Sequence, residues 1–301
     1  MQERFYALNA DIKNSRKMTD NKRQSAQYEL EAAIRLLNAL FKREIEKPVM
    51  FTAGDEVQGL FRSLSGAALY FRSLSMFVKS AVLRGGIGAG DWTTRMNSPS
   101  SAMQDGSTYY AARAAIEAAE WLGRYDLVIR TDDSRRRLSF LSDNSLTVMF
   151  DHCLSIGAMR TKPQRDKAML IELFVPIIAL ASPWSIMDER EYSINYLEEV
   201  FGFLHSYARA ADYDASTMRT IYPLLEADTF YSIAPRFYRY IRDAAHEYEE
   251  DFLAGSMRGI TYLLAEGLDL SRVTLDRQLA KARIVQERNA AVFFCRSAER
   301  I

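Results

Sequence analysis

Apolar residues in the first half of the chain recur at the strand period in some segments and at the helix period in others. Every second residue is apolar near the start, which predicts a strand at 5–12. Residues 24–45 carry apolar side chains at helical spacing, and Pro48 is expected to end this helix. A β-hairpin is then expected at 49–61, with Gly54-Asp55 as its turn.

The same alternation of helices and strands continues to residue 141. The expected segments are a helix at 65–78, a glycine-rich strand at 81–90, a loop at 93–105, an alanine-rich helix at 106–122, a strand at 125–131 and a short strand at 137–141. The resulting order, β-α-β-β-α-β-α-β, predicts an α+β domain of the ferredoxin-like or palm type, in which helices cover one face of an antiparallel sheet.

The rest of the chain shows only the helical period. We therefore expect two domains, a palm-like domain at 1–141 and an all-α domain at 142–301, with the polar segment 132–144 as the linker. The expected helices are 145–156, 165–181, 188–211, 216–226, 235–265 and 274–299, with Ser216 and Thr274 as N-caps.

Composition places the chain among globular proteins. Of its 301 residues, 48% are hydrophobic and 26% are charged, which allows a sizeable core. Lys plus Arg and Asp plus Glu number 39 each, so the surface as a whole is not the strongly basic one that coats nucleic acid. Two cysteines and three histidines argue against a disulfide framework and against a Cys-rich or His-rich metal site.

Neither secretion nor membrane anchoring is expected. The N-terminus has an early acidic residue and no long apolar core, unlike a signal peptide. The most apolar run, 169–181, is interrupted by Glu172 and Pro176 and is shorter than the about 20 residues of a membrane span. We therefore expect a cytoplasmic protein.

Residue types suited to phosphate chemistry gather at two expected strand ends. Asp11 ends the first strand and Asp55 lies at the hairpin tip, so a palm sheet brings their carboxylates close together. Mg²⁺ or Mn²⁺ is expected there, with Glu56 as a third ligand, because hard cations take carboxylates together with substrate phosphates. Lys13 and Arg16 are candidates for contacts to phosphates. Each of these residues also has a plainer interpretation, as a turn residue or a solvated surface charge.

Glycines alternate in the expected strand at 81–90. Gly86 and Gly88 remove side chains from one face of that strand, so a ligand or a second chain can approach the backbone closely. We therefore place both glycines among the candidate cofactor-binding residues.

Four motifs occur in an order that resembles the SatD family of bacterial proteins, over about residues 3–122. The motifs are Ala10-Asp11-Ile12-Lys13-Asn14-Ser15-Arg16, Ala53-Gly54-Asp55-Glu56-Val57-Gln58-Gly59-Leu60, Gly86-Ile87-Gly88-Ala89-Gly90-Asp91-Trp92-Thr93-Thr94, and Asp105-Gly106 through Ala112-Arg113. The family pattern is itself similar to class III nucleotide cyclases and to GGDEF-type diguanylate cyclase domains, which share a palm fold.

This resemblance implies a metal-dependent nucleotide site. By it, Asp11 and Asp55 match the metal-binding carboxylates and hold the ion on a nucleoside triphosphate, while the backbone after Asp11 meets the phosphates. Arg113 matches the catalytic arginine near the transition state of class III cyclases. A homodimer is implied as well, because cyclase sites form between two palms.

Two positions depart from the cyclase pattern. Tyr109 stands where those enzymes have an asparagine, and Phe51 stands where they have a lysine. Because both positions handle the ribose and the base, the resemblance implies metal and triphosphate binding without implying a particular reaction.

Three functions stay open. The first is a divergent cyclase or nucleotidyltransferase that makes a nucleotide signal, and the second is a non-catalytic nucleotide-sensing or regulatory protein with the helical half as output. The third is a DNA-binding regulator, based on Arg236, Arg239 and Arg242 at three-residue spacing and on segment 275–285, which loosely resembles a helix-turn-helix without its glycine turn. The plainer interpretation of that basic stripe is a solvated helix face.

Overall fold

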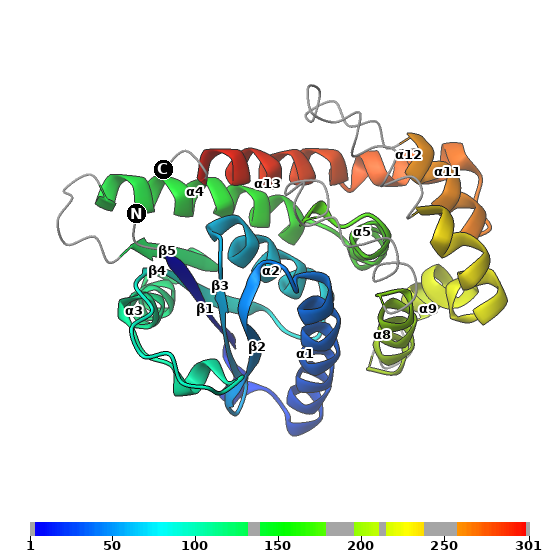
Figure 1. Cartoon of the computed structure of the whole chain (residues 1–301). Coiled ribbons are helices and arrows are strands. Elements are labelled where there is room, and N and C mark those ends of the chain that lie inside the picture. Colours follow the sequence, from blue (N-terminus) through cyan, green and yellow to red (C-terminus); the bar gives the residue numbers. More distant parts are fainter. Residues whose placement is uncertain (1–3, 132–138, 179–195, 211–214, 238–257, 299–301) are drawn as a thin grey trace. The chain divides into compact units, whose positions relative to one another are not determined.

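The computed structural model describes residues 4–131, 139–178, 196–210, 215–237 and 258–298 (Figure 1). Contacts divide the chain into two compact units, Met1–Ser155 with Ala290–Ile301 and Ile156–Asn289. Most of the linker expected at 132–144, and parts of the helices expected at 188–211 and 235–265, lie outside the described residues.

A sheet of five strands, counted over the described residues, forms the centre of the first unit (Figure 1). The strands are β1 (Phe5–Ile12), β2 (Ile45–Ala53), β3 (Glu56–Phe61), β4 (Leu83–Gly90) and β5 (Leu127–Thr131), and they lie in the order β2-β3-β1-β4-β5. Neighbouring strands are antiparallel except β4 and β5, which are parallel. The first predicted strand and the predicted hairpin are confirmed, and the unit is α+β as expected.

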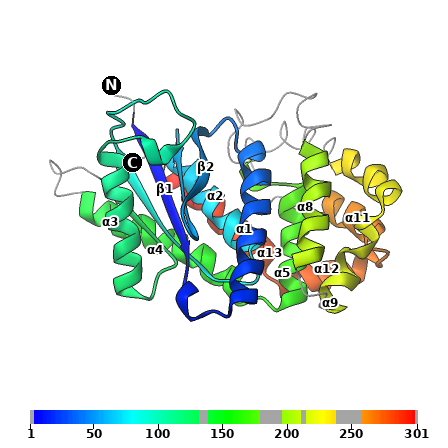
Figure 2. The ribbon, with the colours of Figure 1, turned by 90° about the horizontal axis from the view of Figure 1, so that it is seen from below.

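Helices cover both faces of this sheet. They are α1 (Asp20–Leu40), α2 (Leu64–Phe77), α3 (Ser107–Leu122) and α4 (Ser139–Ala158), with the short 3-10 turns η1 (Ser15–Lys17) and η2 (Ser101–Met103). Helices α1 and α2 lie on one side of the sheet and α3 lies on the other (Figure 2). A methyl group added at Gly85 would meet the ring of Phe71 in α2 at 2.6 Å, whereas one at Gly86 would meet the backbone of α3 at 2.3 Å.

The prediction that helices cover only one face was therefore wrong. Strand β1 buries the apolar residues Phe5 and Ala7 on one face and Leu8 and Ala10 on the other. A strand that is apolar on both faces needs cover on each of them.

Helix α1 ends at Leu40, earlier than predicted, and Pro48 lies inside β2. Since β2 is an edge strand, the missing N–H of proline is tolerated there. The strand is irregular near Pro48, and the side chain of Asn38 in α1 donates to the Val49 carbonyl at 2.9 Å and accepts from the Val49 amide at 3.2 Å. The proline marks an irregular sheet edge and does not end the helix.

The described part of the second unit is helical, as predicted. Its elements are α5 (Lys162–Phe174), α8 (Leu197–Ala210), α9 (Ala215–Ile221), η5 (Tyr222–Leu225), a helical stretch at 227–237, α11 (Arg258–Gly267), α12 (Arg272–Lys281) and the start of α13 (Ile284–Ala298), whose residues from Ala290 on belong to the first unit.

Several helix boundaries and one strand differ from the predictions, and Ser216, which was expected as an N-cap, lies inside α9. The helix expected at 274–299 is two helices, since Arg283 between them has a left-handed φ of 51°. The N-cap of α12 is Ser271 and not Thr274, because the Ser271 hydroxyl accepts from the Thr274 amide at 3.2 Å. Residues 139–141, expected to end a short strand, are helical in α4. Among the described residues, none of the helices combines the length and the apolar character that crossing a membrane requires.

Candidate functional site

The chain turns sharply where β1 ends, and this turn forms one wall of a pocket. Asn14 has a left-handed φ of 57°, which asparagine tolerates better than most residues, and η1 follows it. Arg23 of α1 holds the turn, because its guanidinium donates to the Ser15 carbonyl from Nε at 3.1 Å and from Nη2 at 2.9 Å. The tip of the β2–β3 hairpin, where Gly54 has a φ of 60°, lies at another wall.

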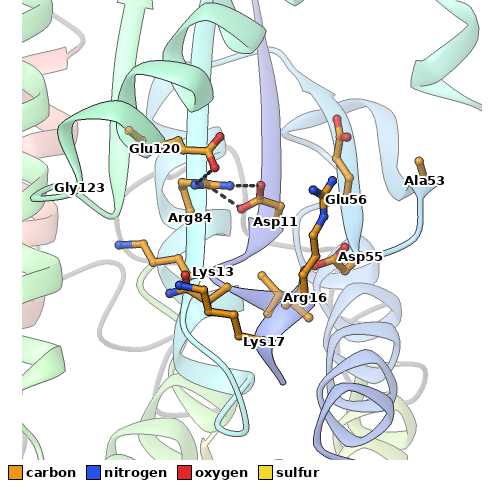
Figure 3. A pocket seen from close by; sticks show the side chains of 14 residues that line it. Asp11, Lys13, Arg16, Lys17, Ala53, Asp55, Glu56, Arg84, Glu120 and Gly123 are labelled. Atoms are coloured by element: carbon orange, nitrogen blue, oxygen red, sulfur yellow. Dashed lines mark hydrogen bonds and ion pairs between the residues drawn. The ribbon is translucent and has the colours of Figure 1, made fainter. Parts of the chain in front are cut away.

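The pocket has a volume of about 870 Å³ and lies at the C-terminal end of β1 (Figure 3). Its basic lining residues are Lys13, Arg16, Lys17 and Arg84. Its acidic lining residues are Asp11, Asp55, Glu56 and Glu120. A pocket lined by charged side chains of both signs suits a charged ligand.

Five of the eight residues predicted to form a site line this pocket, namely Asp11, Lys13, Arg16, Asp55 and Glu56. They come from the end of β1 and from the hairpin, which the antiparallel pairing of β1 with β3 brings together. The predicted proximity of the β1 end and the hairpin tip is therefore present in the fold.

Helix α3 occupies the face of β4 that was expected to admit a ligand. A methyl group at Gly88 would lie 2.1 Å from the Ala112 amide nitrogen and 2.2 Å from the Thr108 carbonyl oxygen. Gly86 and Gly88 do not line the pocket, and their missing side chains allow α3 to pack closely on β4. Arg113 lies on the exposed side of α3 and does not line the pocket either.

Arg84, the first residue of the glycine-rich stretch, lies between two carboxylates of the pocket (Figure 3). Its Nε and Nη2 lie 3.0 Å and 2.6 Å from the two carboxylate oxygens of Asp11, and its Nη1 lies 3.1 Å from Glu120. Burial lowers the pKa of Arg84, but the hydrogen bond and charge of Asp11, and then those of Glu120, outweigh burial, so the pKa is raised. Both oxygens of Asp11 are therefore engaged by a permanent cation.

Lys13, another basic residue of the pocket lining, is also paired with a carboxylate. Its ammonium pairs with Asp126 next to β5, and its backbone N–H donates to the Val82 carbonyl at 2.9 Å. Asp151 of α4 lies near this pair. Burial raises the pKa of Asp151, and the charge of Asp126 raises it further, while Lys13 acts in the opposite direction.

Four charged groups of the pocket are left for a ligand. Arg16 and Lys17 are exposed, and Asp55 and Glu56 are half-buried. Within the part of the chain that the structure describes, none of these four side chains has a hydrogen bond or ion pair. The pocket therefore offers two cationic and two anionic groups to a ligand.

The expected divalent ion fits the hairpin better than the end of β1. Mg²⁺ is held in proteins by one or two carboxylates together with substrate phosphates, and Asp55 and Glu56 meet that need. At the end of β1, in contrast, each carboxylate oxygen of Asp11 already accepts a hydrogen bond from Arg84. Over the described residues, no three or more His, Cys, Asp or Glu side chains cluster in a way that could hold a metal ion.

The two positions that depart from the cyclase pattern lie outside the pocket lining. Tyr109 is 8% exposed and packs in a core cluster with Phe5 and Leu60, and burial raises the pKa of its phenol. Phe51 is 39% exposed on β2. Tyr109 is therefore a core residue of the α3 face.

Sequence reasoning missed Arg84, Glu120 and Lys17. Arg84 lies opposite Asp11 in the pairing of β1 with β4, and this register was not visible in the sequence. Glu120 reaches the pocket because its helix, α3, packs on the face of β4 that carries Gly86 and Gly88. Lys17 could have been predicted as a pocket residue, because it follows Arg16 directly in the sequence and carries the same charge.

The basic stripe expected in the helical half is described only at Arg236. Its guanidinium pairs with Glu266 of α11 at 2.7 Å, and the hydrogen bond from that pair raises the pKa of Arg236. Arg239 and Arg242 lie outside the described residues.

Comparison with known proteins gives one family match. Residues 5–151 match the family model described as the SatD family, so the match extends beyond residue 122 through β5 and into α4. No curated protein and no solved structure matches the chain.

Proposed function

Residues 5–151 of this chain are a SatD-family domain, and from this premise we propose that the domain binds a nucleoside triphosphate, together with Mg²⁺ or Mn²⁺, in the pocket at the end of β1. The observation that carries the proposal is the meeting of the Asp11–Arg16 segment with Asp55 and Glu56 around one cavity. A volume of about 870 Å³ lies within the range of small-molecule sites.

The triphosphate is proposed to lie against Arg16 and Lys17. Both are exposed at the pocket, and a guanidinium and an ammonium form charge-assisted hydrogen bonds with phosphate oxygens. Lys13 contributes positive potential, although its ammonium is already paired with Asp126.

Asp55 and Glu56 are proposed to hold the divalent ion that accompanies the phosphates. Such an ion neutralises phosphate charge and bridges phosphate oxygens when it is bound. Both residues line the pocket from the hairpin, and the Arg16 side chain lies beside them (Figure 3).

A palm-type core is the finer fold that we propose. The first six elements follow the order β-α-β-β-α-β, and their strands lie in the order β2-β3-β1-β4 with antiparallel neighbours, an arrangement typical of split βαβ folds. Strand β5 and helix α3 are additions to that core.

A homodimer is proposed through the exposed side of α3. This side carries Arg113, which does not line its own pocket, and it exposes 65% of Tyr110 and 85% of Trp121. Large exposed aromatic side chains are typical of interaction surfaces. Sedimentation analysis of the wild type and of Trp121→Ala tests this proposal. The wild type is expected to be a dimer, and Trp121→Ala is expected to dissociate more readily. A monomeric wild type contradicts the proposal.

Binding is the function that the site supports best. Arg84 pairs with Asp11, one of the two carboxylates that match the cyclase metal ligands. Tyr109 and Phe51, which replace the asparagine and lysine of the cyclase pattern, lie outside the pocket lining. The groups that direct turnover in cyclases therefore differ in this domain. A nucleotide-sensing protein with the helical unit as output is therefore placed first. Cyclase or nucleotidyltransferase activity is the second candidate, favoured by the carboxylate of Asp55 at the hairpin tip.

Calorimetric titration with ATP, GTP, CTP and UTP in the presence of Mg²⁺ tests the binding proposal. At least one nucleotide is expected to bind the wild type, and the Arg16→Ala/Lys17→Ala variant is expected to bind it about tenfold or more weakly, since two charge-assisted contacts are lost. Lys22→Ala is the matched control, because Lys22 is exposed on α1 and does not line the pocket. Absence of binding by the wild type overturns the proposal.

The same samples decide between sensing and turnover. Products of the incubated nucleotides are resolved by mass spectrometry for the wild type and for Asp55→Ala. A product that disappears in Asp55→Ala identifies an enzyme. Binding without any product identifies a sensor.

A further inference from the structure

Arg84 and Asp11 face each other across the pairing of β1 with β4. The contact does not depend on a flexible loop, since the ladder places both residues at one register position on the same face of the sheet. The guanidinium presents Nε and Nη2 to the two oxygens of Asp11, at 3.0 Å and 2.6 Å. This two-point geometry is the one in which arginine binds carboxylate most strongly.

The same guanidinium also holds a second acid. Its remaining nitrogen, Nη1, lies 3.1 Å from Glu120 of α3, so that Arg84 bridges a strand and a helix (Figure 3). The Arg84 and Asp11 side chains are only 15% and 23% exposed, whereas Glu120 is 67% exposed. The pair with Asp11 is therefore the more shielded half of the bridge, and water and salt screen it less.

We propose that Arg84 fills the cation position at Asp11 and thereby limits this pocket to a divalent ion on the hairpin side. The part of this inference that concerns nucleotide rests on the proposed function. The part that concerns Asp11 rests only on the contacts of Arg84. Arg84 is thus a specificity-determining residue, because it decides how many divalent ions the pocket takes.

Charge explains why one cation excludes the other. Asp11 and Glu120 with Arg84 carry a net charge of one negative unit, and a divalent ion added beside Asp11 would face a guanidinium at hydrogen-bond distance. Replacing Arg84 by a neutral residue leaves two carboxylates around the space of the lost guanidinium. Two such carboxylates repel each other, and a hydrated divalent ion relieves that repulsion.

Titration with Mn²⁺ alone tests this exclusion without any nucleotide. The free ion is measured by its electron paramagnetic resonance signal, for the full chain and for Arg84→Met. Arg84→Met is expected to gain a Mn²⁺ site at Asp11 that the wild type lacks. Its dissociation constant is expected to be at least about tenfold lower than that of any Mn²⁺ binding elsewhere on the wild type. Arg84→Lys keeps the positive charge and is expected to behave as the wild type.

Asp11→Asn provides two controls. In Arg84→Met/Asp11→Asn the gained site is expected to disappear, which assigns it to Asp11. In the otherwise wild-type chain, Asp11→Asn is expected to leave Mn²⁺ binding unchanged, a readout that does not depend on the folding of an Arg84 variant. The inference is overturned if Asp11→Asn removes a wild-type Mn²⁺ site, or if folded Arg84→Met gains none.

The titration is then repeated with a non-hydrolysable nucleoside triphosphate analogue. The wild type is expected to bind one Mn²⁺ per nucleotide, and Arg84→Met is expected to bind two. If the analogue does not bind, the proposed function fails while the result with Mn²⁺ alone still decides the role of Arg84. If the wild type binds two ions, the role of Arg84 fails while nucleotide binding stands.

Discussion

At the scale of single residues, Gly88 leaves the least room for a side chain among the described glycines, because helix α3 packs directly against it. An added Cβ would lie within 2.1 Å of the Ala112 amide nitrogen, and backbone atoms cannot rotate away as a side chain can. Gly88→Ala is therefore expected to destabilise the protein by about 3 kcal/mol or more, which urea unfolding measures.

Gly54→Ala is the control for that experiment. Gly54 has open space around its Cα but a left-handed φ of 60°, so its replacement is expected to cost about 1 kcal/mol. If Gly88→Ala is as stable as the wild type but binds nucleotide more weakly, the ligand-binding interpretation of this glycine is correct and the packing interpretation is wrong.

Asp151, like Glu29, is a carboxyl of the first unit whose pKa is raised, so it contributes a dependence of stability on pH. Burial and the charge of Asp126 raise the pKa of its carboxyl in the folded state. A raised carboxyl pKa means that the folded state binds the proton more tightly, so this contribution favours folding at low pH and is lost as the pH rises through the folded pKa. At pH values above the folded pKa, the ionised carboxylate of Asp151 disfavours folding.

Asp151→Asn is therefore expected to raise the melting temperature at pH 7. The amide still accepts a hydrogen bond but carries no charge next to Asp126. The difference from the wild type is expected to shrink as the pH falls towards the ordinary carboxyl pKa of about 4. Thermal melts across this range measure it, and a variant that melts below the wild type at pH 7 contradicts the assignment.

At the scale of elements, the long connection between β4 and α3 depends on one buried amide. Gln104 accepts from Trp92 Nε1 at 3.2 Å and from the Met96 amide at 3.0 Å. Its own amide lies 3.1–3.4 Å from the carbonyls of Met96, Ser98 and Ser100. The loop therefore has a defined path although it contains little regular structure.

Gln104→Leu is expected to loosen this loop while the sheet stays intact. Each lost hydrogen bond contributes about 1 kcal/mol, so amide hydrogen exchange at 94–104 is expected to accelerate by about tenfold or more. Gln104→Glu keeps the acceptor oxygen but turns a second oxygen towards the three carbonyls, so exchange at least as fast as in Gln104→Leu is expected. Unchanged exchange in Gln104→Leu contradicts this role.

At the scale of the whole molecule, the described part of the second unit contains two buried ion pairs. Arg160 pairs with Glu287 at 3.3 Å, and both side chains are 3% exposed. Arg288 pairs with Glu172 at 2.9 Å and also donates to the Val175 carbonyl. Removing one partner of such a pair leaves an uncompensated buried charge, which is strongly destabilising.

Glu287→Ala is therefore expected to destabilise the second unit by about 3–5 kcal/mol. The pocket at the end of β1, proposed to bind nucleotide, is lined only by residues of the first unit, so any binding there is expected to persist. Hydrogen exchange resolved along the chain checks both statements in one experiment. Equal loss of protection in both units contradicts the assignment of these pairs to the second unit alone.

Local patterns were sufficient for much of the first unit. The apolar alternation of β1 and the Gly54-Asp55 turn predicted their elements correctly, because the strand period and the demand for a positive φ are local properties. The expectation that Pro48 ends the helix is wrong, because a proline is tolerated within β2 only when that strand lies at the edge of the sheet. Edge position is a property of the sheet and cannot be seen in the residue itself.

The sequence by itself determined an α+β first half, a helical second half, two segments of charged residues, and four ordered motifs that resemble one family. Only the tertiary structure decided what those charges do. The register of β1 with β4 places Arg84 on Asp11, and the packing of α3 fills the face beside Gly86 and Gly88. Element type follows from neighbours along the chain, whereas the pairing of charges follows from strand order and helix placement, which depend on residues far apart in sequence.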